Sequence, residues 1–315
     1  MRFARLGRIL SIVVVLAVSH LVAACSDDGD AGSADSITVG FITKFPVDFY
    51  DTMVEAAREY DRTHDDVEVL FGQGKSGDDD TGQIEQINNM IAQKVKAIAI
   101  TPTSPKVQGA LDKAVKGGIK IVLVDNDIPG WTGKSSIVAT NNLAGGRLAG
   151  KWLAERLPAG ATVGFLQGRL GNPSLDDRIK GIREGLGDKV TVVAEPATDC
   201  DQTKGLNAAQ DILTAHPNIT AIYGACGPPI LGAMQAISAA GKKQGEVVVV
   251  GFDASPDEIA AIAAGDQAAS VAQFPAKMGS LGVETAVKAA RGHNVEAVID
   301  TGTEMVTKQN VAGFQ

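Results

Sequence analysis

The sequence predicts an α/β protein made of two similar lobes, each a doubly wound parallel sheet with helices on both faces. Two observations predict this class: from Ile37 onward, short β-branched runs alternate with segments of helical periodicity, and the runs form two groups of five. Composition agrees, because 44% apolar and 21% charged residues are typical of a soluble globular chain with a full core. The length of 315 residues accommodates two domains.

The strand candidates are too continuously apolar for half-exposed strands, and are typical of parallel strands buried on both faces. They are Ile37–Thr43, Val67–Gly72, Ala97–Thr101, Ile119–Val124, Ile137–Thr140, Thr162–Gln167, Val190–Ala194, Ile219–Tyr223, Val247–Phe252 and Ala269–Ala272. Helices predicted between them include Tyr50–Thr63, Gln83–Gln93, Leu143–Leu157, Thr203–Ala215 and Ala276–Arg291. The two groups of strands divide near Ala139–Asn142, where one strand ends and a new helix begins.

The N-terminal segment predicts export and a lipid anchor. Three arginines precede an almost wholly apolar run from Ile9 to Val18, which is short for a membrane span but typical of a signal peptide. Small residues then lead directly to Cys25, so residues 1–24 are expected to be removed and Cys25 to be lipidated. An ordinary signal peptide with an incidental cysteine is the alternative. Residues 25–36 contain no apolar side chain larger than Ala, which predicts a flexible tether.

Several chemistries fit the sequence badly. A formal net charge of −8, spread along the chain, would repel a phosphate backbone, so nucleic acid is not an expected partner. His64, His216 and His293 lie in or beside predicted helices without metal-ligand spacing. Neither a nucleophile elbow nor a phosphate-binding glycine loop is present. We therefore expect no metal, no cofactor and no catalytic residues.

Polar and aromatic residues follow the predicted strands, where open parallel sheets bind their ligands. Carboxylates accept hydroxyl hydrogen bonds, amides both donate and accept, and flat rings cover the C–H face of a sugar. This residue set favours a small, neutral, polyhydroxylated ligand. The expected ligand-binding residues are Lys44, Phe49, Tyr50, Asp125, Asn126, Asn172, Asp176, Phe252, Asp253 and Gln273.

Some of these polar residues have simpler interpretations. Asn142 and Ser174 are expected only to cap helices, whereas Asp125 and Asp253 each follow a buried strand in opposite lobes. Paired carboxylates can hydrolyse glycosides, but two lobes that open and close are a poor frame for fixed acid–base geometry.

Four ordered segments carry a family resemblance: Lys204–Asn207 through Pro217, Val249–Asp253 with Pro256, Ala272–Pro275 and Gly282–Ala286. With them the chain resembles, from about Ile37 to Asn310, the ribose-type periplasmic sugar-binding proteins that serve ATP-driven importers. The resemblance implies a type I periplasmic binding protein fold, with a three-strand hinge and ligand trapped as the lobes close. It implies a first lobe of residues 37–140 plus 274–302 and a second of 141–273 plus 303–315. It also matches Phe49 and Tyr50 to a stacking pair, Asp125 to a binding carboxylate, and Phe252, Asp253 and Gln273 to second-lobe contacts.

The departures from the ribose pattern concern specificity. Asn126 and Asp176 stand where the resemblance implies two ligand-contacting arginines, so we expect weak ribose binding and a preference for an alditol or a different monosaccharide. A cationic ligand is a further possibility, because three carboxylates would otherwise repel one another. Cys200 and Cys226 replace a stacking ring and an amide at neighbouring strand ends of the second lobe. A disulfide between them is possible; two buried free thiols are the alternative.

Together these features predict an extracytoplasmic, lipid-anchored solute-binding protein. It captures a small sugar or sugar alcohol and delivers it to the membrane permease of an ABC-type importer. It touches the membrane only through its anchor, and it is not an enzyme. A sensor of the same fold, acting with a membrane receptor, is the alternative. A sugar-responsive repressor fits less well, because the signal peptide takes the place of its DNA-binding domain.

Overall fold

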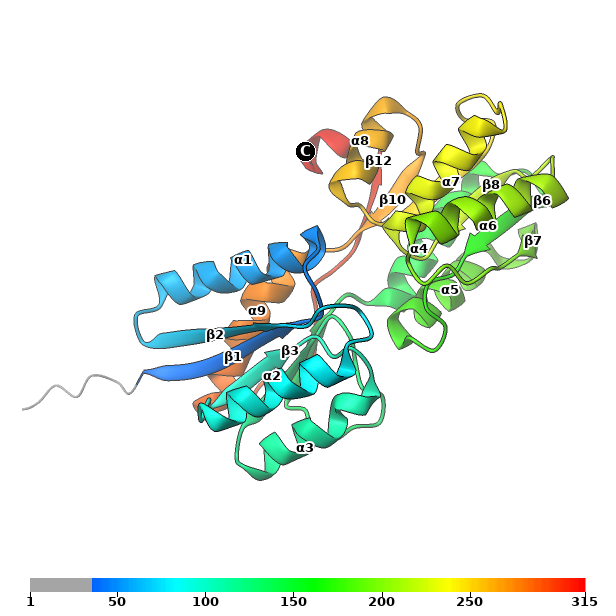
Figure 1. The fold of residues 1–315 in the computed structure, drawn as a ribbon. Helices are drawn as coiled ribbons and strands as arrows, with labels where there is room; N and C mark the ends of the chain where they lie inside the picture. Colours follow the sequence, from blue (N-terminus) through cyan, green and yellow to red (C-terminus); the bar gives the residue numbers. More distant parts are fainter. Residues whose placement is uncertain (1–35, 315) are drawn as a thin grey trace, which may run out of the picture. The chain divides into compact units, whose positions relative to one another are not determined.

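The computed structural model describes residues 36–314. The predicted signal peptide, Cys25 and all but the last residue of the tether lie outside this range. Two six-stranded sheets with flanking helices account for the described chain (Figure 1). This architecture confirms the predicted fold class.

The first sheet has the strand order β11-β5-β4-β3-β1-β2, and all its neighbouring strands run parallel. We call this sheet with its helices the first lobe. Its strands are β1 (Ile37–Thr43), β2 (Val67–Gln73), β3 (Ala97–Ile100), β4 (Lys120–Val124), β5 (Ser136–Ala139) and β11 (Val298–Asp300). Its helices are α1 (Asp48–Thr63), α2 (Asp80–Ala92), η1 (Pro105–Val107), α3 (Gln108–Lys116) and α9 (Pro275–Ala290).

The second sheet, β12-β10-β9-β8-β6-β7, repeats this order, except that its sixth strand β12 runs antiparallel to β10. We call it with its helices the second lobe. Its strands are β6 (Ala161–Leu166), β7 (Val190–Ala194), β8 (Ala221–Gly224), β9 (Val248–Asp253), β10 (Ala269–Ala272) and β12 (Glu304–Thr307). Its helices are α4 (Asn142–Arg156), α5 (Pro173–Leu186), η2 (Gly187–Lys189), α6 (Gln202–Ala215), α7 (Gly227–Ala239), α8 (Pro256–Ala264) and η3 (Val311–Phe314).

Each sheet is buried on both faces, which explains why its strands are apolar without alternation. In β3, Ala97 and Ala99 face α1 and α9, whereas Ile98 and Ile100 face α2 and α3. In the second lobe, α4 and α5 cover one face and α6 and α7 cover the other. Among residues 36–314, no helix combines the length and apolar character needed to span a bilayer.

The chain passes three times between the lobes. The passages follow β5 at Thr140, follow β10 at Gln273, and join β11 to β12 through residues 301–303. These passages give the three-strand hinge that the fold class includes. The two short strands β11 and β12, which lie on either side of the third passage and add one strand to each sheet, were not predicted.

Candidate functional site

The site residues lie where strands of both sheets end. Asp125 follows β4 and Asp253 ends β9, and these are equivalent strands in the repeated order. Both aspartates adopt left-handed backbone conformations, with φ of 65° and 99°, respectively. A non-glycine residue held there costs of order 1–3 kcal/mol, a strain that is concentrated at functional sites. The fold therefore presents one constrained carboxylate from each lobe.

Three protein donors hold Asp253. Its Oδ1 accepts from Arg178 Nη1 at 3.1 Å and from Gln273 Nε2 at 2.6 Å, and its Oδ2 accepts from the Gly227 N–H at 3.2 Å. Gln273 is 7% exposed, and its Oε1 has no partner among the described residues. The second lobe thus offers a fixed carboxylate beside a buried acceptor that is still free.

Arg178 is a central site residue that sequence reasoning missed. It is 4% exposed, donates through Nε to Asn142 Oδ1 at 2.8 Å and through Nη1 to the Ala225 carbonyl at 2.8 Å, and lies 3.8 Å above the Phe252 ring. The expectation that Asn142 only caps a helix is wrong: Asn141 caps α4, and Asn142 orients Arg178. The site therefore keeps one of the two cations that the sequence reading considered lost.

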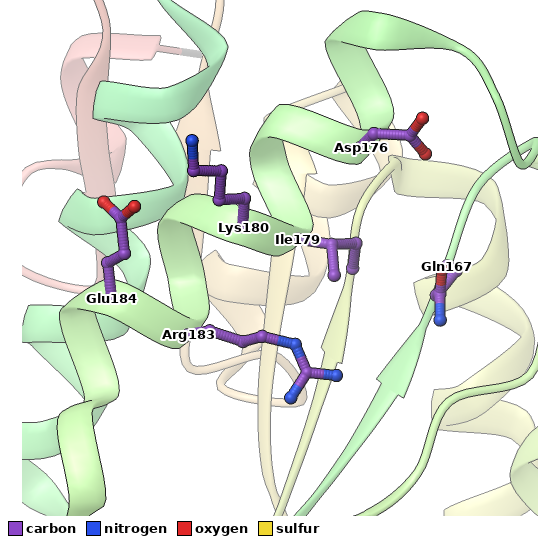
Figure 2. A pocket seen from close by; sticks show the side chains of 6 residues that line it. All are labelled: Gln167, Asp176, Ile179, Lys180, Arg183 and Glu184. Atoms are coloured by element: carbon purple, nitrogen blue, oxygen red, sulfur yellow. The ribbon is translucent and has the colours of Figure 1, made fainter.

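The structure does not bring Asp176 together with the other predicted residues. Asp176 is exposed on the first turn of α5 and lines a surface pocket of about 430 Å³ with Gln167, Ile179, Lys180, Arg183 and Glu184 (Figure 2). Two residues further along the same helix, Arg178 is the side chain that reaches Asp253.

Phe252 has a different role from the predicted ligand contact. Its ring is fully buried beneath the guanidinium of Arg178 and has no surface left for a ligand. It supports Arg178 through a cation–π contact.

The first lobe holds Asp125 more loosely. Asp125 Oδ2 accepts from Asn126 Nδ2 at 2.7 Å and from the Tyr50 hydroxyl at 3.4 Å. Burial raises the pKa of Asp125, and the nearby positive charges of Lys44 and Arg178 only partly offset this rise. Asp125 therefore carries an incompletely compensated charge.

Lys44 is the cation of the first lobe. It is 6% exposed and follows β1 directly. Burial lowers the pKa of Lys44, Asp125 raises it, and Arg169 and Arg178 lower it further. With Lys44 and Arg178 both near the carboxylates, a cationic ligand is disfavoured.

The aromatic residues of the first lobe form a cluster of three. Phe45 and Phe49 each meet the Tyr50 ring edge-on, with centroids 5.4 and 5.3 Å away. The sequence predicted Phe49 and Tyr50, whereas Phe45 was missed because it lies in the irregular segment before α1. Tyr50 is buried, and its hydroxyl points to Asp125.

Asn126 connects the two lobes. Its Oδ1 accepts from Asn172 Nδ2 at 3.3 Å and lies 3.5 Å from Ser174 Oγ. Asn172 also caps α5 by accepting from the Ser174 and Leu175 N–H groups. The expectation that Ser174 is the cap is therefore wrong.

Cys200 and Cys226 form a disulfide, with Cα atoms 5.8 Å apart. The bridge joins the segment after β7 to the residue that precedes α7. Ala225 and Gly227, on either side of Cys226, are the residues whose backbone groups bond Arg178 and Asp253. The disulfide therefore braces the backbone that holds the second-lobe carboxylate.

Within residues 36–314, no group of three or more His, Cys, Asp or Glu side chains has the geometry to hold a metal ion. The site chemistry is instead that of hydrogen-bond donors and acceptors around two carboxylates.

Comparison with known proteins places this geometry in a family. Residues 39–294 match the family described as periplasmic binding protein domain. The chain is 31% identical over 304 residues to the ribose import binding protein RbsB of Escherichia coli strain K12, over 96% of this chain and 99% of that protein.

Solved structures agree. A solute binding protein of Mycobacterium smegmatis with bound glycerol is 30% identical, with a TM-score of 0.80 over 88% of this chain and 96% of that one. A second, from Bacillus halodurans with bound myo-inositol, is 25% identical, with a TM-score of 0.82 over 90% and 98%. The chain therefore belongs to the family of periplasmic binding proteins of the ribose type, which are substrate-binding components of transport and not enzymes.

Proposed function

We propose that this protein captures a small, neutral, polyhydroxylated molecule, a monosaccharide or an alditol, and delivers it to an ABC-type importer. The observation that carries the proposal is the pairing of Asp125 and Asp253, which end equivalent strands in opposite lobes. Each carboxylate can accept hydrogen bonds from ligand hydroxyls, and a charged hydrogen bond of this kind contributes about 1.5–3 kcal/mol.

Unused hydrogen-bonding capacity beside the carboxylates supports the same ligand class. Gln273 Oε1 is a buried acceptor without a partner in the described chain, and it is suited to a hydroxyl donor. The Lys44 ammonium is a buried donor, suited to a hydroxyl oxygen as acceptor. Hydroxyl groups satisfy both because they donate and accept.

The relatives support this class. Those named above are a ribose import binding protein and proteins with bound glycerol or myo-inositol, and another solved structure, 30% identical, holds D-arabinose. All these ligands are small and polyhydroxylated. They differ in ring size and length, so the precise ligand depends on the side chains particular to this chain.

Fewer residues now support the expectation that D-ribose binds weakly. Arg178 supplies one of the cations considered lost, so the remaining departures are Asn126 and the Cys200–Cys226 bridge. Asn126 is shorter than an arginine and uncharged, and the disulfide offers neither the flat ring nor the amide that it replaces. We therefore expect alditols and other monosaccharides to bind more tightly than D-ribose.

A thermal-shift screen tests the proposal. The panel is D-ribose, D-allose, D-arabinose, myo-inositol, xylitol, erythritol and glycerol. A ligand at 100 times its dissociation constant stabilises the folded state by about 2.7 kcal/mol, which gives a clear rise in melting temperature. No rise with any member would contradict the proposed ligand class.

We further infer that the protein works outside the cytoplasm, anchored through lipid on Cys25. Family membership supports the extracytoplasmic location, and the N-terminal sequence supports the anchor. Cys25→Ser should move the protein from the membrane fraction to the soluble fraction, or leave its signal peptide uncleaved. A Cys25→Ser protein that is processed and still sediments with membranes would contradict the anchor.

A further inference from the structure

Glu258 is an acid buried behind the second-lobe site. It lies in the first turn of α8 and is 0% exposed. Its Oε1 accepts from Gln267 Nε2 at 2.9 Å and from Ser270 Oγ at 2.8 Å, and its Oε2 accepts from the Ser255 N–H at 3.1 Å. The last contact belongs to a capping box with Ser255, but a capping box does not require burial of the acid.

A short chain of hydrogen bonds links Glu258 to the backbone beside Asp253. Ser270 donates to Glu258 and accepts from the Ala254 N–H at 3.1 Å. Ala254 has φ of 49° and Asp253 has φ of 99°, so two successive non-glycine residues adopt positive φ. Such a turn persists only where its surroundings hold it. The Ser270 bond is one such restraint, and Glu258 orients Ser270.

The acid also fits tightly against both backbone segments that support Asp253. A Cβ atom at Gly251 in β9 would lie 1.9 Å from Glu258 Oε1, and one at Gly227 would lie 2.7 Å from Oε2. Gly227 is the residue whose N–H donates to Asp253 Oδ2. Both positions need glycine here because the carboxyl group takes the space of a side chain.

From this geometry we propose that Glu258 is a positioning residue of the ligand site, which holds Asp253 and Ala254 in their strained conformation from behind. The proposal rests on the proposed role of Asp253 in ligand binding. Glu258 itself touches no ligand.

Ionisation of Glu258 gives the proposal a pH signature. Burial, and then the negative charge of Asp253, raise the pKa of Glu258 to about 7. Among residues 36–314, Tyr223 on β8 is a further ionisable group near Glu258: burial raises the pKa of its phenol, Arg178 lowers it, and the charges of Asp253 and Glu258 raise it. Above pH 7, an ionised Glu258 places a second negative charge behind Asp253 in a site that loses water when ligand binds. Ligand affinity should therefore fall between pH 6 and pH 8.

The test compares Glu258→Ala and Glu258→Gln with a control, Asp257→Ala, which alters an exposed acid in the same helical turn. Affinity is measured by calorimetry with the tightest-binding member of the panel above. We expect Glu258→Ala to weaken binding at least tenfold at pH 6, and Glu258→Gln, which keeps the shape but exchanges one accepting oxygen for a donor, to weaken it less. The wild-type decrease from pH 6 to pH 8 should disappear in Glu258→Gln and persist in Asp257→Ala.

Amide hydrogen exchange tests the same proposal without ligand. Exchange at Ala254 and Gly227 should accelerate at least tenfold in Glu258→Ala and remain unchanged in Asp257→Ala. If Glu258→Ala does not fold, Ser270→Ala breaks the same link and should weaken binding at least fivefold. Wild-type affinity and exchange in a folded Glu258→Ala protein would overturn the proposal. Failure of every panel member to bind wild-type protein would overturn the proposed function alone, because the exchange result stands independently.

Discussion

Asp125 and Asp253 end equivalent strands of two similar lobes, yet the protein holds them differently. Asp253 has Arg178, Gln273 and the Gly227 N–H as partners, whereas Asp125 has a neighbouring amide and a long bond from Tyr50. Burial raises the pKa of Asp125 because its charge is incompletely compensated.

This difference separates two ways of preparing a carboxylate for ligand. The second lobe is preorganised, since its hydrogen bonds are made before ligand arrives, and it loses little further freedom on binding. In the first lobe, ligand hydroxyls would supply hydrogen bonds that the protein itself lacks. We therefore expect the ligand to bind first to the second lobe. Hydrogen bonds to the first lobe then complete the binding site.

The largest effect should come from Arg178→Ala. This change leaves Asp253 without its cation and removes a charge buried on Phe252, and loss of one partner of a buried pair costs about 3–5 kcal/mol. Urea unfolding measures the loss. Arg183→Ala on the same helix is the control, because its pairing with Glu195 is partly exposed and contributes about 0–1 kcal/mol. Equal losses in the two variants would contradict the preorganised second lobe.

Removal of the disulfide should distinguish the lobes further. Cys200 and Cys226 are 26 residues apart, and loop-closure entropy for such a separation gives about 3–4 kcal/mol of stabilisation. In the Cys200→Ser/Cys226→Ser double variant, amides of β7 and β8 should exchange faster, while those of β1 and β3 should not change. Faster exchange in both lobes would show that the lobes unfold as one unit.

Replacing the two carboxylates by amides should change the stability of the ligand-free protein in opposite directions. Asp125→Asn and Asp253→Asn should each weaken binding by about 1.5–3 kcal/mol, measured by calorimetry. Without ligand, Asp253→Asn should destabilise the protein by leaving the charge of Arg178 unpaired. Asp125→Asn should stabilise it at pH 7, since it removes a charge that burial disfavours.

The pH dependence of stability tests whether the charge of Asp125 destabilises the folded protein. Its pKa is raised in the folded state, so its contribution to stability is fully present below the unfolded value of about 3.9 and is lost as pH rises. The advantage of Asp125→Asn should therefore vanish near pH 3 and grow toward neutrality. A stability gain that is constant with pH would show that ionisation of Asp125 is not its cause.

The smallest effect should come from Tyr50→Phe. The Tyr50 hydroxyl donates to Asp125 over 3.4 Å, a long hydrogen bond that should contribute less than about 1 kcal/mol to binding. Calorimetry with the same ligand measures it. A loss larger than that of Asp125→Asn would mean that Tyr50 contacts the ligand directly.

The fold could be predicted largely because buried parallel strands are continuous apolar runs. The ten predicted strands match β1 to β10 with ends shifted by at most two residues. The missed strands β11 and β12 have only three and four residues, and each includes an acidic residue, so they carry no such run. Their position comes from tertiary contacts that a local pattern does not contain.

The sequence predicted the positions of the candidate residues at strand ends better than those on helices. Asp125, Asp253 and Gln273 follow directly from strand ends, where the direction of the chain is fixed. Arg178 was missed and Asp176 chosen because residues two apart on a helix point to nearly opposite faces. A basic residue on the buried side of α5, among Ile182 and Leu186, was the signal available in the sequence.

Helix α9 lies near the C-terminal end of the sequence, but it packs in the first lobe, which is built mainly from the N-terminal part of the chain. It comprises Pro275–Ala290 of a 315-residue chain, yet it packs against α1, β3 and β4 and contributes Met278, Val283 and Ala286 to the first-lobe core. Domains usually fold as units, N-terminal first, during synthesis. Here the N-terminal lobe lacks a core helix until most of the chain has left the ribosome. A nascent chain that has not yet produced α9 therefore leaves the core of the first lobe incomplete.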